Sequence, residues 1–442
     1  MIQIQKHPII KGAFILTITG FITRFMGFFY RIFLSQTFGE ESVGLYQLIF
    51  PIYALGFSLT AAGIETSISR CVANKMSLGK SSQAKEILYT GISISVFIAC
   101  LTTWFLQNHA AFIAENYLSE TRCESLLIIL SYAFPFAALH SCICGYYFGL
   151  KQTKIPAISQ LIEQVVRVIS VYLLYLYFIR RSINTGIIIA VIGLVAGEIA
   201  SSFFCMKAVN NKRYPLLSVQ SFLSNYAYHT KEILLLSFPL TCNRVLLNLL
   251  QSIEAVSIPL QLQAFGFSVN KSLSTYGVLT GMALPCILFP SAITNAVSTV
   301  LLPTVTEIQT LNNRKEMRSI IKKVTFLCFS LGLICCAFLL LFGRIAGDIL
   351  FHSELAGEFI ITLAWICPFL YTNSNFISII NGLGYTIISF IFNTLGLLIR
   401  IGSIFFLIPS FGICGYLWGL LGSQLITFLC CIIFLAYYLS KN

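Results

Sequence analysis

Charged residues are scarce in this sequence. Aspartate, glutamate, lysine and arginine together make up only 10% of its 442 residues, whereas hydrophobic residues make up 57% and the mean hydropathy is +0.85. This composition excludes an ordinary soluble domain, in which about 25% of the residues are charged. Apolar stretches of about 20 residues, long enough to cross a bilayer as helices, recur along the chain. Because such stretches are too long for barrel strands, we predict an all-α integral membrane protein.

Patterns that indicate metal or nucleotide chemistry are also missing. No C-x-x-C pair occurs among the 15 cysteines, and nearly all of them fall inside apolar stretches. We therefore interpret them as small hydrophobic residues and expect no metal and no cofactor. Gly79-Lys80-Ser81 resembles the end of a phosphate-binding loop, but Asn74 stands where that loop requires glycine. Transport must then draw on ion gradients, membrane potential or substrate supply.

A membrane-embedded transferase is the competing class, and it normally gathers acids or histidines at one membrane face. The acids Glu115, Glu120 and Glu124 share an outer loop, where His109 is the only nearby histidine. We interpret this set as a solvated loop. The sequence therefore predicts that the protein is not an enzyme.

The apolar stretches predict twelve spans, six in each half. They lie at roughly residues 12–34, 43–69, 87–107, 125–148, 157–179, 185–206, 232–256, 275–303, 324–343, 359–381, 386–408 and 412–439. Lysine and arginine concentrate in the segments on the same side as the N-terminus, which predicts that both termini are cytoplasmic. Topology and contact with anionic membrane lipids then explain the net charge of +12 without nucleic acid.

One pattern occurs in both halves at the same internal spacing. A Pro-Phe pair is followed by a glycine, an amide residue and an arginine: Pro135-Phe136, Gly149, Gln160 and Arg167, then Pro368-Phe369, Gly382, Asn393 and Arg400. The sixth and twelfth spans also share G-x-x-x-G, as Gly193/Gly197 and Gly415/Gly419. That motif favours close packing of helices.

The repeat predicts two pseudo-symmetric six-helix lobes, residues 1–206 and 232–442, joined by a basic cytoplasmic connector at 207–231. Both halves start and end on the inside, as in parallel repeats related by an axis along the membrane normal. We expect a central cavity between the lobes, with the substrate site in it. The sequence does not determine the oligomeric state.

Polar residues at three- and four-residue steps place an arginine at the centre of the first and seventh spans. The stripes are Thr17, Gly20, Arg24, Gly27, Arg31 and Ser35, and Ser237, Thr241, Arg244, Asn248 and Gln251. A cation at the bilayer centre costs about 2.5–3.5 kcal/mol and usually faces a bundle interior or a wet cavity. The guanidinium fork suits bidentate contact with phosphate, so these residues predict an anionic diphosphate head group as cargo. The candidate substrate-binding residues are Arg24, Arg31, Arg167, Arg244, Asn248, Gln251 and Arg400.

Structural hydrogen bonds are the alternative interpretation of these arginines. Arg167 has Glu163 one turn earlier as a natural partner, whereas Arg400 has Gly396 at the matching place. The acids Glu65, Glu163, Glu198 and Glu254 are candidates for ion coupling or for pairing with arginines. His140, the only histidine inside an expected span, is interpreted as a packing residue rather than a proton relay.

Residues 11–70 resemble the stage V sporulation protein B group, in the polysaccharide-export branch of the multidrug/oligosaccharidyl-lipid/polysaccharide (MOP) superfamily, which is related to the MurJ lipid II flippases. The residues that carry the resemblance are Gly12, Gly20, Arg24, Gly27, Tyr30-Arg31, Gly39, Gly44-Leu45-Tyr46, Pro51 and Ala62-Gly63. The resemblance implies a MATE- or MurJ-like fold, alternating access, a bacterial plasma membrane location and cavity arginines at Arg24 and Arg31. This chain departs from these relatives in two ways. Residues 275–303 carry no charge, whereas MurJ-like flippases have charged residues in the eighth helix, and the chain has twelve expected spans, whereas the group commonly has fourteen.

We therefore expect a flippase or exporter of a lipid-linked oligosaccharide or peptidoglycan precursor, similar to lipid II, that serves spore cortex or cell-wall synthesis. Two alternatives remain. A multidrug or cation antiporter needs a carboxylate in its cavity, which the arginines disfavour. A membrane scaffold for cell-wall enzymes needs no transport at all.

Overall fold

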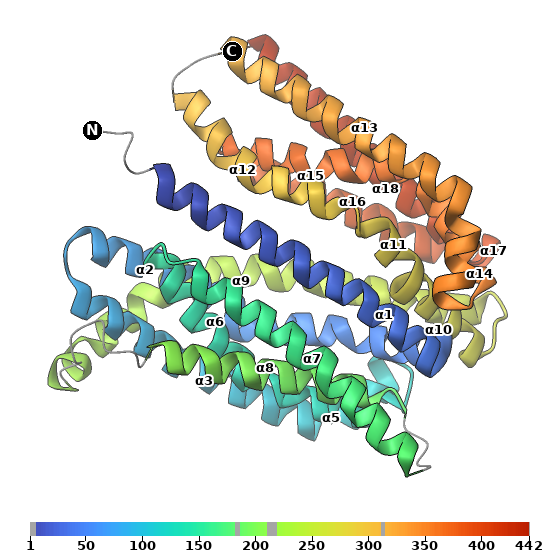
Figure 1. Ribbon diagram of the computed structural model, residues 1–442, viewed down its shortest axis with the longest axis horizontal. Helices are drawn as coiled ribbons and strands as arrows, with labels where there is room; N and C mark the ends of the chain where they lie inside the picture. Colours follow the sequence, from blue (N-terminus) through green and yellow to red (C-terminus); the bar gives the residue numbers. More distant parts are fainter. Residues whose placement is uncertain (1–5, 182–185, 210–218, 311–313, 442) are drawn as a thin grey trace. The chain divides into compact units, whose positions relative to one another are not determined.

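The computed structural model describes residues 6–181, 186–209, 219–310 and 314–441, and every regular element within these ranges is a helix (Figure 1). The first half contains α1 (Lys6–Phe57), η2 (Ser58–Ala62), α2 (Gly63–Ser77), α3 (Ser81–Asn108), α4 (Ala110–Phe112), η3 (Ile113–Tyr117), α5 (Cys123–Ser131), α6 (Ala133–Gly149), α7 (Lys154–Arg180) and α8 (Ile188–Val209). The second contains α9 (Val219–Ala264), α10 (Val269–Gly277), η4 (Val278–Ala283), α11 (Leu284–Leu288), α12 (Ser291–Thr310), α13 (Arg314–Ala346), η5 (Gly347–Phe351), α14 (Glu354–Ala364), α15 (Cys367–Gly382), α16 (Thr386–Phe406), α17 (Ile408–Phe411) and α18 (Ile413–Lys441). The predicted all-α fold is confirmed.

The number of helices that can cross a membrane agrees with the sequence. Within the described ranges, eight helical segments are long and apolar enough to span, or eleven if each of three bent helix pairs counts as one span. The first segment, Phe14–Ser77, holds two of the expected spans, because the helix is interrupted at Gly39 (φ 76°, ψ 172°). Only glycine adopts this backbone conformation readily. Counting the two sides of Gly39 separately gives the twelve expected spans.

The chain forms two compact units. The first combines Met1–Gly27 with Leu45–Ser252, and the second combines Phe28–Gly44 with Ile253–Asn442. Helices α1 and α9 each contribute to both units as a result. Since α9 begins at Val219, part of the predicted connector is helical, while residues 210–218 lie outside the described ranges. The lobe boundaries drawn from the sequence stay a prediction.

Helix irregularities recur in the two halves. The π-helical turns η2 and η4 begin at residues separated by the same number of positions as Arg24 and Arg244. The turn η3 follows the helix of the expected third span, and η5 follows the helix of the expected ninth span. Single π-turns of this kind are often found at functional sites. Their repetition shows that the duplication extends to backbone geometry.

The repeated Pro-Phe pair marks a break in a spanning helix. Helices α5 and α6 bend by 40° just before Pro135, and α14 and α15 bend by 58° just before Pro368. Proline has no backbone N–H and is tolerated in the first turn of a helix, so it suits the start of the second piece. The glycines of the repeat allow close packing. A Cβ on Gly149 would come within 2.7 Å of the Ser69 backbone oxygen, and one on Gly382 within 2.9 Å of that of Leu302.

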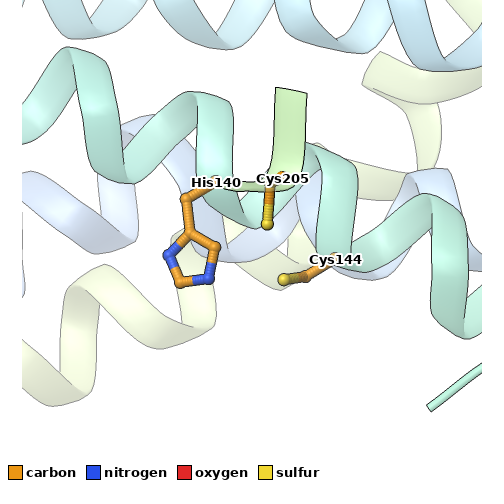
Figure 2. Close-up of side chains that lie close together, drawn as sticks. All are labelled: His140, Cys144 and Cys205. Atoms are coloured by element: carbon orange, nitrogen blue, oxygen red, sulfur yellow. The ribbon is translucent and has the colours of Figure 1, made fainter. Parts of the chain in front are cut away.

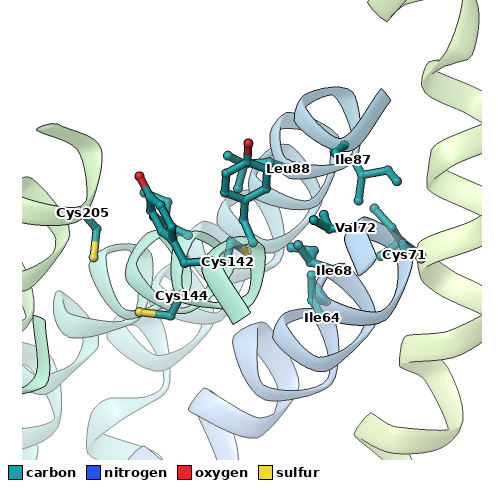
Figure 3. Close-up of a cluster of buried hydrophobic side chains, with 14 residues drawn as sticks. Ile64, Ile68, Cys71, Val72, Ile87, Leu88, Cys142, Cys144 and Cys205 are labelled. Atoms are coloured by element: carbon teal, nitrogen blue, oxygen red, sulfur yellow. The ribbon is translucent and has the colours of Figure 1, made fainter. Parts of the chain in front are cut away.

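Each unit has its own apolar core. In the first unit, side chains from α2, α3 and α6 pack together with Cys205 of α8 and Ile233 of α9 (Figure 3). In the second, α12, α13, α15 and α18 supply the core. Cys71 and Cys142 are both buried in the first core, in agreement with their interpretation as small hydrophobic residues.

The G-x-x-x-G motif of α8 brings this helix close to α7. A Cβ on Gly193 would lie 2.2 Å from a methyl carbon of Val171, and one on Gly197 would lie 2.7 Å from the backbone oxygen of Glu163. The predicted close packing is therefore confirmed. Because Gly197 lies against the turn of α7 that holds Glu163, the next residue, Glu198, is held near that acid.

One loop acid differs from its expected state. Glu120 is only 7% exposed and accepts a hydrogen bond from Arg122 Nε at 2.7 Å, so it is not a solvated loop residue. Hydrogen bonding to the Arg122 guanidinium holds the pKa of this carboxyl below its usual value. The contact therefore stabilises the folded loop above the ordinary carboxyl pKa, and this contribution is lost as the pH falls through the lowered pKa.

Candidate functional site

Arg24 is the least constrained of the candidate arginines. Its side chain lies exposed on α1, and within the described ranges it takes part in no hydrogen bond or ion pair. Arg31, two turns later, is half-buried and already interacts with a neighbouring group. Arg24 belongs to the first unit and Arg31 to the second. An exposed guanidinium on a membrane helix needs water, a lipid head group or a cargo to satisfy its five N–H donors.

Arg244 of α9 is also exposed and is only lightly engaged. Its Nη2 donates to Thr66 Oγ1 at a long 3.4 Å, and its charge interacts with Glu65 on the same side of α2. The close approach of Gly63 to Thr241 brings the two helices together, because a Cβ on this glycine would lie 2.0 Å from the threonine hydroxyl. Glu65 therefore acts in part as a partner of this arginine.

The two polar residues that follow Arg244 on the stripe, Asn248 and Gln251, differ in whether they already have hydrogen-bond partners within the described ranges. Asn248 donates to Ser58 Oγ at 2.5 Å and to the Ala54 backbone oxygen at 3.3 Å. It thereby connects α9 to the π-turn η2, where the helical hydrogen-bonding pattern changes. Gln251 is exposed. Asn248 is thus committed to structure, whereas Gln251 can reach a ligand.

Arg167 has the partner that the sequence indicated. Its Nη2 forms an ion pair with Glu163 one turn earlier on α7, and both side chains are mostly buried, at 17% and 19% exposed. This confirms the predicted i,i+4 pair. Its charge is balanced locally, which favours the structural interpretation for this arginine.

Arg400 has a partner that its own helix does not supply. Its Nε lies 3.3 Å from Glu254 Oε1 of α9, and Tyr416 of α18 donates to the same oxygen at 2.6 Å. Glu254 was one of the acids proposed either for ion coupling or for pairing with arginine, and the pairing is confirmed. Both units therefore contain a buried arginine, glutamate and tyrosine cluster.

Glu198 of α8 is the centre of the cluster in the first unit. It accepts a hydrogen bond from Tyr53 at 2.7 Å, and its other oxygen lies 3.6 Å from His140 Nδ1. The glutamate is 4% exposed and the histidine 9% exposed. His140 therefore does more than fill space, because it faces a carboxylate on one side and Ser159 Oγ, at 2.6 Å, on the other.

A pocket of about 210 Å³ opens beside this cluster inside the first unit. Its lining includes the acids Glu65, Glu163 and Glu198, together with Tyr53 and His140. Gln160, a member of the repeat pattern, also lines it. Drug-sized ligands occupy pockets of about 300–1,000 Å³, so this one suits waters and a proton or small inorganic cation better than an organic cation. Its three carboxyl groups favour a positive occupant.

The second unit contains a larger, mostly apolar groove of about 780 Å³. The lining residues come from α13, α15 and α18 and include Ile321, Phe326, Phe329, Phe376, Phe428, Ile432, Leu435 and Leu439, with Arg318, Lys322, Thr325 and Ser440 as the polar members. Phe428 stacks between Phe329 and Phe376. The groove thus combines an apolar channel with two cations, the arrangement that a lipid with an anionic head group requires.

Sequence reasoning missed the residues that complete these clusters. Tyr53 and Tyr416 are ordinary aromatic residues in apolar stretches, and nothing in their spacing indicates a buried carboxylate as partner. His140 and Cys144 carry a detectable signal, because residues four apart share a helical face. The partners of both lie on other helices, which no local pattern reveals.

Comparison with known proteins places the chain in a family. The family model described as polysaccharide biosynthesis protein matches residues 9–309. The chain belongs to this family. Stage V sporulation protein B of Bacillus subtilis (strain 168) is 28% identical over 418 residues, which cover 93% of this chain and 80% of that protein. The resemblance to that group is confirmed.

Solved structures confirm the fold of this polysaccharide biosynthesis family member. The lipid II flippase MurJ in an inward closed conformation has a TM-score of 0.73 at 16% identity, over 95% of this chain and 87% of that one. An inward-facing multidrug resistance MATE family transporter of the MOP superfamily has a TM-score of 0.75 at 14% identity, over 97% and 98% of the two chains. The chain is an integral membrane protein with the MATE- and MurJ-like fold.

Proposed function

We propose that this protein is an alternating-access flippase or exporter of a lipid-linked oligosaccharide or peptidoglycan precursor with an anionic diphosphate head group. The observation that carries this proposal is the exposed state of Arg24 and Arg244 on membrane helices of the first unit. Neither is neutralised by an ion pair with a carboxylate within the described ranges, unlike Arg167 and Arg400. Guanidinium groups in this state fit a phosphate cargo and disfavour a cationic one.

The groove of the second unit supports a lipid-linked cargo. An isoprenoid tail matches its apolar walls, and a diphosphate matches the Arg318 and Lys322 cations. The positive-inside prediction assigns both cations to the cytoplasmic face. We propose that this groove holds the isoprenoid tail of the cargo.

The acidic pocket of the first unit supports coupling to a proton or inorganic cation. Three of the four predicted coupling candidates line it: Glu65, Glu163 and Glu198. The pocket is too small for a drug, so its carboxylates do not favour a multidrug antiporter. We propose that the pocket drives transport, and that the protein catalyses no covalent chemistry.

The relatives and the charge distribution support a proposal for the cellular setting. The name of stage V sporulation protein B supports a role in spore cortex or cell-wall synthesis for this chain. Lysine and arginine placement supports a bacterial plasma membrane protein with both termini in the cytoplasm.

A transport assay with two cargoes tests the proposal. The purified protein is reconstituted into liposomes that contain fluorescent lipid II, and a parallel set is loaded with a fluorescent organic cation. We expect protein-dependent movement of lipid II between leaflets and no transport of the cation above that of empty liposomes. Movement of the cation without lipid II would favour the antiporter, and movement of neither would favour the scaffold.

Groove variants test the proposed lipid site. We expect Arg318→Ala/Lys322→Ala to weaken precursor binding at least about tenfold, because each charge-assisted hydrogen bond contributes about 1.5–3 kcal/mol. Lys315→Ala/Lys323→Ala on the same helix is the matched control, since it removes the same charge from residues outside the groove lining. Binding is measured by microscale thermophoresis of lipid II in detergent. Equal loss in both double variants would contradict the groove assignment.

A further inference from the structure

Three potential metal ligands converge in the first unit. His140 and Cys144 lie four residues apart on α6, and Cys205 approaches them from α8 (Figure 2). One ligand atom of each residue lies within 4.8 Å of the others. All three side chains are buried, and both cysteines are free thiols. We propose that His140, Cys144 and Cys205 form a zinc-binding site that connects α6 to α8.

The spacing of the ligand atoms is close to that of a zinc site. Zinc binds histidine nitrogen at about 2.0–2.1 Å and cysteine sulfur at about 2.3 Å in tetrahedral geometry, which places neighbouring ligand atoms about 3.5–3.8 Å apart. The ligand atoms lie within 4.8 Å of one another, so side-chain rotations would have to bring them somewhat closer to reach these values. The helices themselves need not move far, because α6 and α8 already pack against each other.

Charge balance favours zinc in so buried a place. Two thiolates neutralise a divalent cation, so the complex of Zn²⁺ with Cys144 and Cys205 carries no net charge, and the two thiol protons are released on binding. A neutral complex avoids the high cost of an unpaired buried charge. Sulfur ligands also select against magnesium and calcium, which prefer oxygen.

Glu198 supplies the second sphere that such a histidine usually has. One of its oxygens lies 3.6 Å from His140 Nδ1 and has no hydrogen-bond partner within the described ranges. A zinc-bound histidine commonly donates its other ring N–H to a carboxylate, which fixes its orientation. With the Nδ1 proton directed at Glu198, the Nε2 lone pair faces the thiols.

The fourth position and an access route are both present. Ser159 Oγ lies 2.6 Å from His140 Nε2 and 3.6 Å from Cys144 Sγ, so it borders the space between the ligands. The acidic pocket is lined by His140 and Cys144, which gives water and metal a path to the site. A water from the pocket or the serine hydroxyl completes the tetrahedron.

A second group that includes His140 suits a different ion by its ligand chemistry. Glu163 and Glu198 lie within ligand distance of the same histidine, but their oxygens suit a proton or a hard cation. His140 therefore stands between a sulfur site and a carboxylate site. Zinc would hold the ring in one orientation at the wall of the proposed coupling pocket, and this role is independent of which substrate is transported.

Metal content and cobalt substitution test the site. We expect the full-length protein, purified under reducing conditions with added Zn²⁺ and then desalted, to retain about one zinc per chain by mass spectrometry of the elements. Cobalt in place of zinc should give the thiolate charge-transfer and tetrahedral d–d bands of a mixed sulfur and nitrogen site. The cobalt spectrum needs no variant, so it stays informative if a variant fails to fold.

Cysteine variants assign the ligands. Cys144→Ser and Cys205→Ser should each lose the zinc and the cobalt bands, whereas Cys142→Ser, a buried cysteine two residues away on α6, should keep both. Zinc-free wild-type protein without a cobalt spectrum overturns the proposal, as does equal metal retention in all three variants. Non-reducing peptide mapping that finds a Cys144–Cys205 disulfide in protein from growing cells also overturns it.

Discussion

Arg24→Ala/Arg244→Ala is expected to lower the rate of lipid II translocation in proteoliposomes by about 100-fold. Each guanidinium that contacts phosphate contributes about 1.5–3 kcal/mol, which is about tenfold or more for each arginine. Thermal stability should change little, because neither arginine forms an ion pair with a carboxylate within the described ranges. The measurement is the initial rate of protein-dependent lipid II movement, at matched amounts of reconstituted protein.

Two controls separate cargo contact from loss of charge. Arg180→Ala/Arg181→Ala removes two exposed arginines at the end of α7, and translocation should persist. Arg24→Lys/Arg244→Lys keeps both charges but loses bidentate geometry, and an intermediate rate is expected. Full translocation by the double alanine variant would remove the main support for an anionic cargo, and sporulation or wall synthesis that persists without translocation would favour a scaffold.

Glu254→Gln is expected to destabilise the second unit by about 3 kcal/mol. It leaves the Arg400 guanidinium without its counter-charge, and breaking a buried ion pair from one side costs about 3–5 kcal/mol. We expect the lower end, because the Arg400 side chain is 23% exposed. The measurement is the midpoint of chemical unfolding in detergent.

Two further variants, compared with Glu254→Gln, test the role of Arg400. Glu254→Gln/Arg400→Met removes both charges and should recover most of the lost stability. Tyr416→Phe should cost about 1.5–3 kcal/mol, as expected for one hydrogen bond to a charged group. A folded Glu254→Gln/Arg400→Met protein that still moves lipid II shows a structural pair. If the folded double variant loses translocation instead, Arg400 contacts the cargo.

Much of the architecture follows from sequence because its causes are local or repeated. Apolar length predicts the spans, and the equal spacing of the Pro135 and Pro368 patterns predicts two related halves. The helix break near each proline was not predicted, although proline acts on its own helix turn. The Arg167–Glu163 pair was predictable for the same reason, as both residues share one helical face.

The remainder depends on contacts between distant segments. Glu254 contacts Arg400 and Tyr416 only because three separate helices pack together. The sequence around Arg400, with Gly396 one turn earlier, therefore did not indicate this partner. The predicted spans leave a gap between residues 34 and 43, but the backbone angles at Gly39 that make the interruption cannot be read from hydropathy. Cys205 joins His140 and Cys144 because α8 packs against α6, and cysteine composition alone indicated only apolar packing.

Helices α1 and α9 each belong to both units, since the boundaries fall after Gly27 and after Ser252 rather than in the basic connector. A gene divided at that connector would encode two incomplete fragments. The N-terminal fragment would lack the part of α9 that belongs to the first unit, and the C-terminal fragment would lack Phe28–Gly44 of α1, which belongs to the second unit. We therefore expect neither fragment to fold into a complete unit on its own.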